Sequence, residues 1–157
     1  MTFSLRRLTL VAALGLTPFA AWWAAAEETR VTFPDLDALI HYTTVTRGNV
    51  VEHMLTTQEA IDAVQAGQPI PPGTHVVLVD YRDGSDEVYR YFVMQKGEGW
   101  GDDFDERRRT GDWQFQFYWG DRSINMDENT ARCQRCHQSR EGSDYMYTYN
   151  DLRRFGQ

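Results

Sequence analysis

Hydrophobic and polar residues alternate over several short stretches of the chain, and this period of two is typical of β-strands. In residues 113–119, which read WQFQFYW, aromatic side chains alternate with glutamines and predict a strand with one buried aromatic face. Residues 75–81 are almost continuously apolar. The predicted strands are residues 42–47, 50–55, 75–81, 88–94 and 113–119, with turn residues 83–86 between the third and the fourth.

A helix is predicted after the second strand, because Thr56 and Glu59 have the spacing of a capping box. In that arrangement each of the two side chains accepts a backbone N–H of the other residue. Gly67 is expected to end this helix, whose apolar residues recur at helical spacing. Two further helices are predicted, from Asp35 to about His41 and from Asp127 to about Ser139.

Together these elements predict an α+β fold with an antiparallel β-sheet core and a few short helices. Residues 27–34 are expected to lead into the fold as an extended segment that ends at Pro34. We predict a single domain over residues 27–157, a length that can bury a core without disulfide bonds.

The first 26 residues have the layout of a secretory signal peptide. Two arginines, a mostly apolar run and three consecutive alanines follow one another in that order, which predicts cleavage near Ala26. An uncleaved anchor is the alternative, which Trp22 and Trp23 at a membrane interface would support. We therefore predict residues 1–26 as a signal peptide, a periplasmic mature protein and no membrane association after cleavage.

The mature protein is strongly acidic. The full chain has a formal charge of −7, and removal of residues 1–26, which contain Arg6 and Arg7 and no acid, changes it to −9. A chain of this charge repels the phosphate backbone, so we expect no nucleic-acid partner.

The sequence Cys133-Gln134-Arg135-Cys136-His137 has the C-x-x-C-H spacing at which haem c is attached. Residues three and four apart share a face of the predicted helix, so both cysteines and the histidine can meet one porphyrin. The thiols are expected to form thioether bonds, and His137 is expected to ligate the iron. The motif predicts one covalent haem c held by Cys133, Cys136 and His137.

Three other uses of the cysteine pair stay open. The pair can form a structural disulfide in an oxidising compartment or a redox-active dithiol. It can also contribute to a zinc site, although no second C-x-x-C or H-x-x-x-H completes four ligands. The adjacent histidine and the late position of the motif favour haem over all three.

The side chain opposite His137 decides what such a haem does. A methionine or histidine there makes an electron carrier, and an empty or apolar site makes a gas binder or a catalyst. No spacing selects one candidate, and those in apolar runs are expected to be core residues. The candidates are Met54, Met94, Met126, Met146, His41, His53 and His75.

Five segments of the chain, in this order, resemble the cytochrome P460 family, which includes the cytochromes c′-β. The resemblance covers roughly residues 34–155 and depends on the late C-x-x-C-H motif together with the strands that precede it. The segments are residues 73–81 (GTHVVLVDY), 91–101 (YFVMQKGEGWG), 111–118 (GDWQFQFY), 133–137 (CQRCH) and 144–149 (DYMYTY).

This resemblance implies a sheet-rich homodimer with one haem near the C-terminus of each subunit and histidine on one face of the iron only. It also implies an open or apolar distal side that small molecules such as nitric oxide can reach. We therefore expect a periplasmic monohaem cytochrome that binds such a ligand. A hydroxylamine-oxidising enzyme and an electron carrier with a methionine ligand are the alternatives.

In family members that oxidise hydroxylamine, a lysine on the G-T-x-x-V strand is cross-linked to the haem edge. At the position that corresponds to this lysine by resemblance, the chain has Leu78, and an aliphatic side chain cannot form the cross-link. Lys96 has two interpretations. It can contact the haem, through a propionate or as a substitute cross-link, or it can be a solvated lysine, and its residue type favours the second. Residues 107–109, all arginine, also have two interpretations. They can pair with the haem propionates, or they can belong to a solvated loop, and their acidic neighbours favour the loop. Further residues expected near the haem or its helix exit are Arg140, Asp144, Tyr145, Tyr147 and Tyr149.

Overall fold

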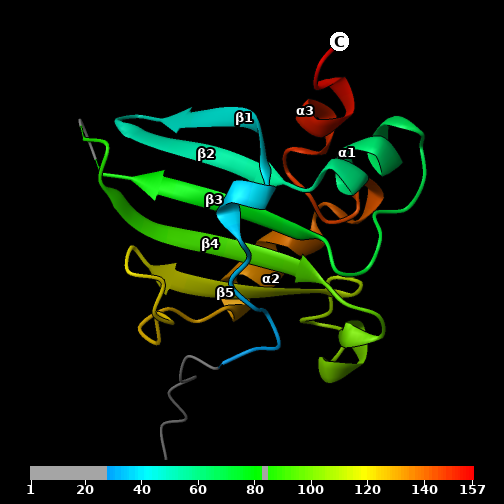
Figure 1. Ribbon diagram of the computed structural model, residues 1–157. Coiled ribbons are helices and arrows are strands. Elements are labelled where there is room, and N and C mark those ends of the chain that lie inside the picture. The colour runs from blue at the N-terminus through cyan, green and yellow to red at the C-terminus, as the bar shows by residue number, and fades with distance from the viewer. Residues whose placement is uncertain (1–27, 83–84) are drawn as a thin grey trace, which may run out of the picture.

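A computed structural model describes residues 28–82 and 85–157. Their strands form a five-stranded antiparallel sheet in which each strand pairs with its neighbour in sequence (Figure 1). This arrangement confirms the predicted α+β fold and its antiparallel core. The strands are β1 (Ile40–Arg47), β2 (Val50–Thr56), β3 (His75–Tyr81), β4 (Val88–Lys96) and β5 (Trp113–Trp119).

Short helices precede, connect and follow the strands in the described part of the chain. The helix with the C-x-x-C-H motif follows the last strand, as predicted, and the helix closest to the C-terminus was not predicted. The 3-10 helices are η1 (Leu36–Ala38), η2 (Trp100–Asp103) and η3 (Glu141–Ser143), and the α-helices are α1 (Gln58–Gln65), α2 (Ala131–Gln138) and α3 (Tyr149–Arg154).

One face of the sheet is covered by the residues that precede β1 (Figure 1). Phe33 packs edge-on against Tyr91 and Tyr118, with ring centroids 5.0 Å apart in both pairs. The Tyr118 hydroxyl donates a hydrogen bond to the Val31 carbonyl at 2.9 Å, and Leu36 of η1 packs on the same cluster. We call this side of the sheet the lead-in face.

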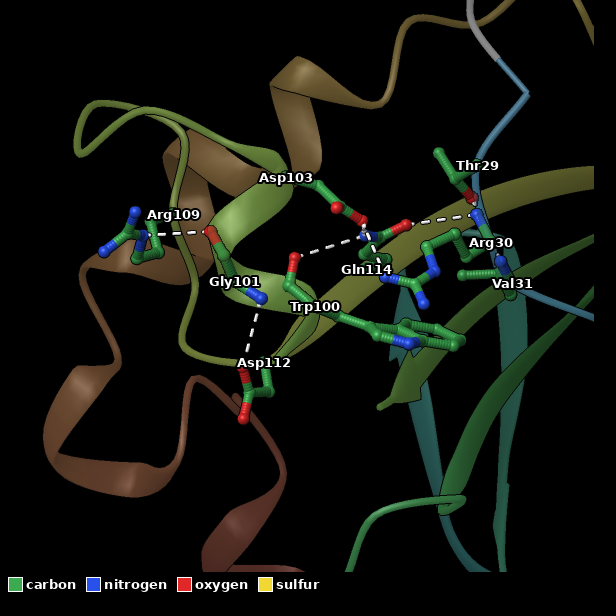
Figure 2. A network of polar contacts seen from close by, with 9 residues as sticks. All are labelled: Thr29, Arg30, Val31, Trp100, Gly101, Asp103, Arg109, Asp112 and Gln114. Atoms are coloured by element: carbon green, nitrogen blue, oxygen red, sulfur yellow. Dashed lines mark hydrogen bonds and ion pairs between the residues drawn. The ribbon is translucent and has the colours of Figure 1, made fainter. Parts of the chain in front are cut away.

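Two buried glutamines attach the lead-in to β5. Gln116 Oε1 accepts the backbone N–H of Thr29 at 2.9 Å, and Gln114 Oε1 accepts that of Arg30 at 3.1 Å. The Gln114 amide also donates to Asp103 of η2 at 2.5 Å (Figure 2). Both glutamines are only 2% exposed, so β5 is buried on both faces, although its alternation predicts one buried aromatic face.

The other face of the sheet carries a core shared with the helices, and we call it the helix face. Ile61 of α1 and Leu152 of α3 are at most 2% exposed and pack in one cluster with Met94 of β4. α2 lies against β5 behind the sheet in Figure 1, and its Cys133 packs against this cluster. The C-x-x-C-H motif therefore belongs to the helix face.

Two predicted helix caps are wrong. Thr57, rather than Thr56, caps α1 by accepting a backbone N–H three residues along at 3.3 Å. Thr56 pairs with β3 as the last residue of β2 and donates its hydroxyl to the His75 carbonyl at 2.8 Å. Thr130, rather than Asp127, immediately precedes α2, because Asp127 lies in a turn before it.

Asp35 caps η1 as predicted, and its carboxylate accepts a backbone N–H two residues along at 3.1 Å. The helix ends at Ala38 instead of His41, since His41 pairs with β2. β4 extends beyond the predicted end at Met94 because its residues up to Lys96 pair with β5. In both cases cross-strand pairing determines where an element ends.

The predicted signal peptide, residues 1–26, lies outside the described residues, as do residues 83 and 84 of the predicted turn. Within the described ranges, no helix has the length and hydropathy needed to cross a lipid bilayer. Export and cleavage therefore stay predictions from the sequence.

Thr57→Ala removes the side-chain acceptor at the start of α1, and we expect it to lower the free energy of unfolding by about 1 kcal/mol. Equilibrium urea unfolding measures this change. Thr57→Ser retains the hydroxyl and is the matched control, for which stability near that of the wild type is expected. Equal losses in both variants would assign the effect to the threonine methyl group instead of the cap.

Candidate haem site

The three chemically active side chains of the C-x-x-C-H motif lie on α2, which is anchored to the protein through Gln134. Gln134 is 1% exposed, and its side-chain oxygen Oε1 accepts a hydrogen bond from Arg108 Nε at 2.8 Å. Cys133 and His137 are partly buried and Cys136 is exposed. The helix thus presents two thiols and one imidazole along a side that passes from the core to the surface.

His137 is held in one orientation by a backbone carbonyl and two aromatic rings. Its Nδ1 lies 2.5 Å from the Tyr145 carbonyl oxygen, to which it donates. The imidazole centroid is 4.8 Å from that of Phe115 on β5 and 5.2 Å from that of Tyr147. Burial lowers the pKa of His137, and the bond to Tyr145 only partly opposes this shift.

A neutral imidazole that donates through Nδ1 carries its lone pair on Nε2. No hydrogen bond to Nε2 is made by the described residues. A backbone carbonyl that accepts from the other ring nitrogen is the usual support for a metal-ligating histidine. His137 therefore has the orientation and protonation state of an iron ligand.

Cys133 and Cys136 are free thiols. Burial raises the pKa of Cys133 to about 12. Redox-active C-x-x-C pairs depend on a thiol whose pKa is lowered well below its ordinary value, so this shift argues against a dithiol oxidoreductase. Among the described residues, no group of three or more His, Cys, Asp or Glu side chains has the arrangement of a metal site, which gives the zinc alternative no support.

The helix face also presents an apolar strip that runs across four neighbouring strands. Met54 pairs with Leu78, Leu78 with Phe92, and Phe92 with Phe117. The first three are partly exposed, whereas Phe117 is buried. Phe117 also lies two residues from Phe115, the contact of His137, and therefore on the same face of β5. Its partly exposed members, Met54, Leu78 and Phe92, offer an apolar surface on the side of the sheet that carries α2.

The residues described above are chemically suited to hold a haem. Two unpaired thiols and a ligand-ready imidazole lie on one helix that packs against the sheet. An apolar strip lies on the same side of that sheet, as the macrocycle of a porphyrin requires.

The structure places the other three histidines on the lead-in face. His53 stacks between His41 and Tyr81, with centroid distances of 4.6 and 4.8 Å. Tyr81 packs against the apolar core residues of the lead-in face. His75 Nε2 lies 3.2 Å from the carbonyl oxygen of Thr32. The five-stranded sheet therefore separates all three side chains from His137, so none is available opposite it within one subunit.

The candidate methionines also divide by location. Met94 and Met146 are core residues with 7% and 2% exposure, as expected for Met94 from its apolar run. Met126 is 50% exposed in the turn before α2. Met54 is itself a member of the apolar strip and is partly exposed. It is therefore the methionine candidate with access to that surface.

The residue type of Lys96 favours a solvated side chain, but in the structure its ammonium group is paired. Lys96 Nζ donates to Asp144 Oδ2 at 2.8 Å, and only 15% of the lysine side chain is exposed. It also lies over the Trp113 ring, 5.6 Å from the centroid. The interpretation of Lys96 as a haem contact stays a prediction.

Two of the three consecutive arginines have structural partners in the protein. Arg108 binds Gln134 of α2, and Arg109 Nε donates to the Gly101 carbonyl at 2.9 Å (Figure 2). The first bond attaches the loop after η2 to α2 and the second holds it to η2, whereas Arg107 and Arg109 are exposed, as expected for a solvated loop. The interpretation of residues 107–109 as propionate partners stays a prediction.

A charged row next to the apolar strip was not predicted from the sequence. Glu52 pairs across the sheet with Asp80, and Asp80 with Arg90. Glu52 and Asp80 are only 6% and 4% exposed, and Arg90 Nε donates to Asp80 Oδ2 at 2.9 Å. Each residue lies two positions from a member of the strip. An acid within the otherwise apolar third strand is the signal that could have revealed this row.

Burial raises the pKa of Glu52 above its ordinary value of 4.5. Arg47 opposes this shift through an ion pair of 3.3 Å, but its own side chain is 66% exposed. The apolar strip is thus bordered by a carboxyl group that is harder to ionise than a solvated one.

The comparison with protein families agrees with this geometry. The sequence model described as Cytochrome P460 matches residues 32–148, which include the whole sheet and α2. A search of curated proteins found no match.

Glu52→Gln is expected to change how the stability of the protein depends on pH. The raised pKa means that Glu52 ionises at lower pH in the unfolded chain than in the folded one, so wild-type stability decreases as pH rises through that window and is then constant. The variant lacks this decrease. The difference in unfolding free energy, variant minus wild type, should therefore increase as pH rises above about 4.5.

Urea unfolding at a series of pH values measures this difference. Glu59→Gln, at an exposed position of α1, is the matched control for the loss of a charge. A difference for Glu52→Gln that stays constant with pH would contradict the assignment.

Proposed function

The chain belongs to the cytochrome P460 family, and from this we propose that it is a periplasmic monohaem c-type cytochrome that binds small ligands such as nitric oxide. Membership of the family supports a c-type haem and its cytochrome chemistry. The finer statements, the compartment and the ligand, are our proposal. It rests on one observation above all: His137 is prepared as a ligand, and the other histidines lie on the opposite face of the sheet.

In this proposal Cys133 and Cys136 hold the haem through thioether bonds and His137 supplies Nε2. The partly buried position of Cys133 and the exposed position of Cys136 suit attachment along one edge of a porphyrin that is only partly enclosed. When bound, haem supplies an iron that takes small diatomic ligands and changes oxidation state. The protein contributes one oriented nitrogen ligand and an apolar surface that limits water.

The apolar strip supports ligand binding over hydroxylamine oxidation. Leu78 lies in the middle of the strip, paired with Met54 and Phe92, and it has no amine with which to form a cross-link to the haem edge. An apolar surface offers no hydrogen bond to a polar substrate, whereas an uncharged diatomic molecule needs none. The strip therefore suits an apolar diatomic ligand better than a polar substrate.

Met54 supports a second candidate function, electron transfer. A methionine thioether is a common sixth ligand of haem c, and Met54 shares the strip with Leu78. Periplasmic export, which the signal-peptide layout of residues 1–26 predicts, and a homodimeric assembly, which the family resemblance implies, are parts of the proposal that apply to both candidates.

The proposed ligand binding is tested on the matured wild-type protein, produced with haem c maturation in a bacterial periplasm. Its ferrous absorption spectrum is expected to be five-coordinate and to change on addition of nitric oxide. A low-spin ferrous spectrum that is insensitive to nitric oxide would refute ligand binding. A red-shifted Soret band would instead indicate a cross-linked haem and the enzymatic alternative.

Replacement of both cysteines by serine is expected to remove the haem peroxidase stain from the polypeptide on a denaturing gel, because non-covalent haem dissociates under those conditions. Conversion of Met126, an exposed methionine near α2, to leucine is the control and should leave the stain unchanged. A stain that persists without the two cysteines would refute thioether attachment.

Met54→Leu separates ligand binding from electron transfer. We expect its ferrous spectrum to match that of the wild type, because a five-coordinate iron has no bond to methionine. Leucine has nearly the same volume, so folding should be preserved. A change from low-spin to five-coordinate in this variant alone, with Met94→Leu as control, would identify Met54 as the sixth ligand and support the electron carrier.

A further inference from the structure

Two consecutive residues after α2 have a backbone conformation that L-amino acids rarely adopt. Asp144 has φ 47° and Tyr145 has φ 61°. Arg122 is the other non-glycine residue with positive φ in the described ranges. Left-handed geometry at two successive non-glycine residues is unfavourable and persists only where surrounding contacts enforce it.

The backbone bend has a direct structural effect, because it directs the Tyr145 carbonyl toward His137 Nδ1. The N–H of Tyr145 donates to the Arg140 carbonyl at 2.8 Å, and that of Asp144 donates to the Glu141 carbonyl at 3.1 Å. These bonds close the bend onto the end of α2. The orientation of the predicted iron ligand thus depends on a strained piece of backbone.

Side chains of the sheet hold this bend in place. Lys96 Nζ donates to Asp144 Oδ2 at 2.8 Å, and Trp113 Nε1 donates to Asp144 Oδ1 at 3.2 Å. Both carboxylate oxygens are therefore engaged. Lys96 and Trp113 are paired across β4 and β5, and Trp113 is fully buried. The pairing of these two strands therefore fixes both donors relative to each other.

The ring of Tyr145 is fixed as well. A Cβ atom on Gly111 would lie 2.8 Å from Tyr145 Cε2, so the ring packs directly on a glycine that no other residue can replace without a shift. Gly111 itself has φ 55°. Contacts on Asp144 and on Tyr145 thus restrain both residues of the bend.

We propose that Lys96, Trp113 and Asp144 form a positioning network that holds the Tyr145 carbonyl against His137 Nδ1. The inference rests on the proposed function, since it assumes that His137 Nε2 ligates the haem iron. Lys96 acts here as a positioning residue and contacts neither the ligand nor the iron. It also gives this lysine a role other than haem cross-linking.

The network influences the iron through the basicity of His137. A proton donor bond from Nδ1 to a carbonyl makes Nε2 a stronger electron donor, which strengthens the iron–histidine bond and favours ferric over ferrous iron. When Asp144 is released, the strained bend relaxes and the carbonyl moves away from Nδ1. The iron–histidine bond is then expected to weaken and the reduction potential to rise.

The test uses the matured haem protein carrying Lys96→Met, which keeps the aliphatic stem on Trp113 and removes the donor. We expect full haem attachment, a lower iron–histidine stretching frequency in the resonance Raman spectrum of the ferrous protein and a higher reduction potential. Asp144→Asn is the second variant, because asparagine tolerates left-handed backbone while it removes the charge. It should shift both measurements in the same direction.

The double variant Lys96→Met/Asp144→Asn distinguishes a coupled network from two separate effects. If the residues act through one ion pair, the double variant should shift the potential no further than the larger single shift. Additive shifts would contradict the network.

Arg30→Met is the matched control. Arg30 also lies over a tryptophan, with Cζ 5.0 Å from the Trp100 centroid, and also pairs with an aspartate, Asp103, at 3.2 Å. It has no connection to Tyr145 in the described contacts, so neither measurement should change. Equal shifts in Arg30→Met and Lys96→Met would overturn the proposal.

The inference and the proposed function fail in different ways. An iron–histidine stretch and potential that are unchanged in both Lys96→Met and Asp144→Asn would overturn the network and leave the haem assignment intact. A wild-type ferrous protein that is high-spin and five-coordinate but shows no iron–histidine stretch would instead refute ligation by His137.

Discussion

The hydrogen bond from His137 Nδ1 to the Tyr145 carbonyl is the constraint on which the candidate site depends. It selects the tautomer that leaves Nε2 available, and it fixes the imidazole between Phe115 and Tyr147. This carbonyl lies in a bend in which both Asp144 and Tyr145 adopt left-handed backbone. A short and locally unfavourable segment therefore carries the acceptor that orients the His137 imidazole.

The sheet contributes by separating chemistry on its two faces. Because side chains alternate along a strand, His53 and Met54 are neighbours in sequence and lie on opposite sides of the protein. The lead-in face takes the histidines, where His53 stacks on His41 and Tyr81. The helix face takes the apolar strip and α2. A single histidine near the candidate haem follows from this alternation.

Much of the fold could be predicted because its signals are local. The five strands, the late helix with the C-x-x-C-H motif and the Asp35 cap follow from periodicity and from residue types at the ends of elements. The errors occurred where distant segments compete for the same residue. Thr56 has the side chain of a helix cap, but pairing with β3 places it in a strand, and the glutamines of β5 are buried because the lead-in binds them.

The spacing of Cys133, Cys136 and His137 was enough to predict, without any tertiary information, which residues attach a haem. The sequence also supported the family, which the match over residues 32–148 shows. Only the tertiary structure decided the partners of those residues. The carbonyl of Tyr145, the pairing of Lys96 with Asp144 and the facing of each histidine depend on packing between segments far apart in the chain, and no local pattern encodes such contacts.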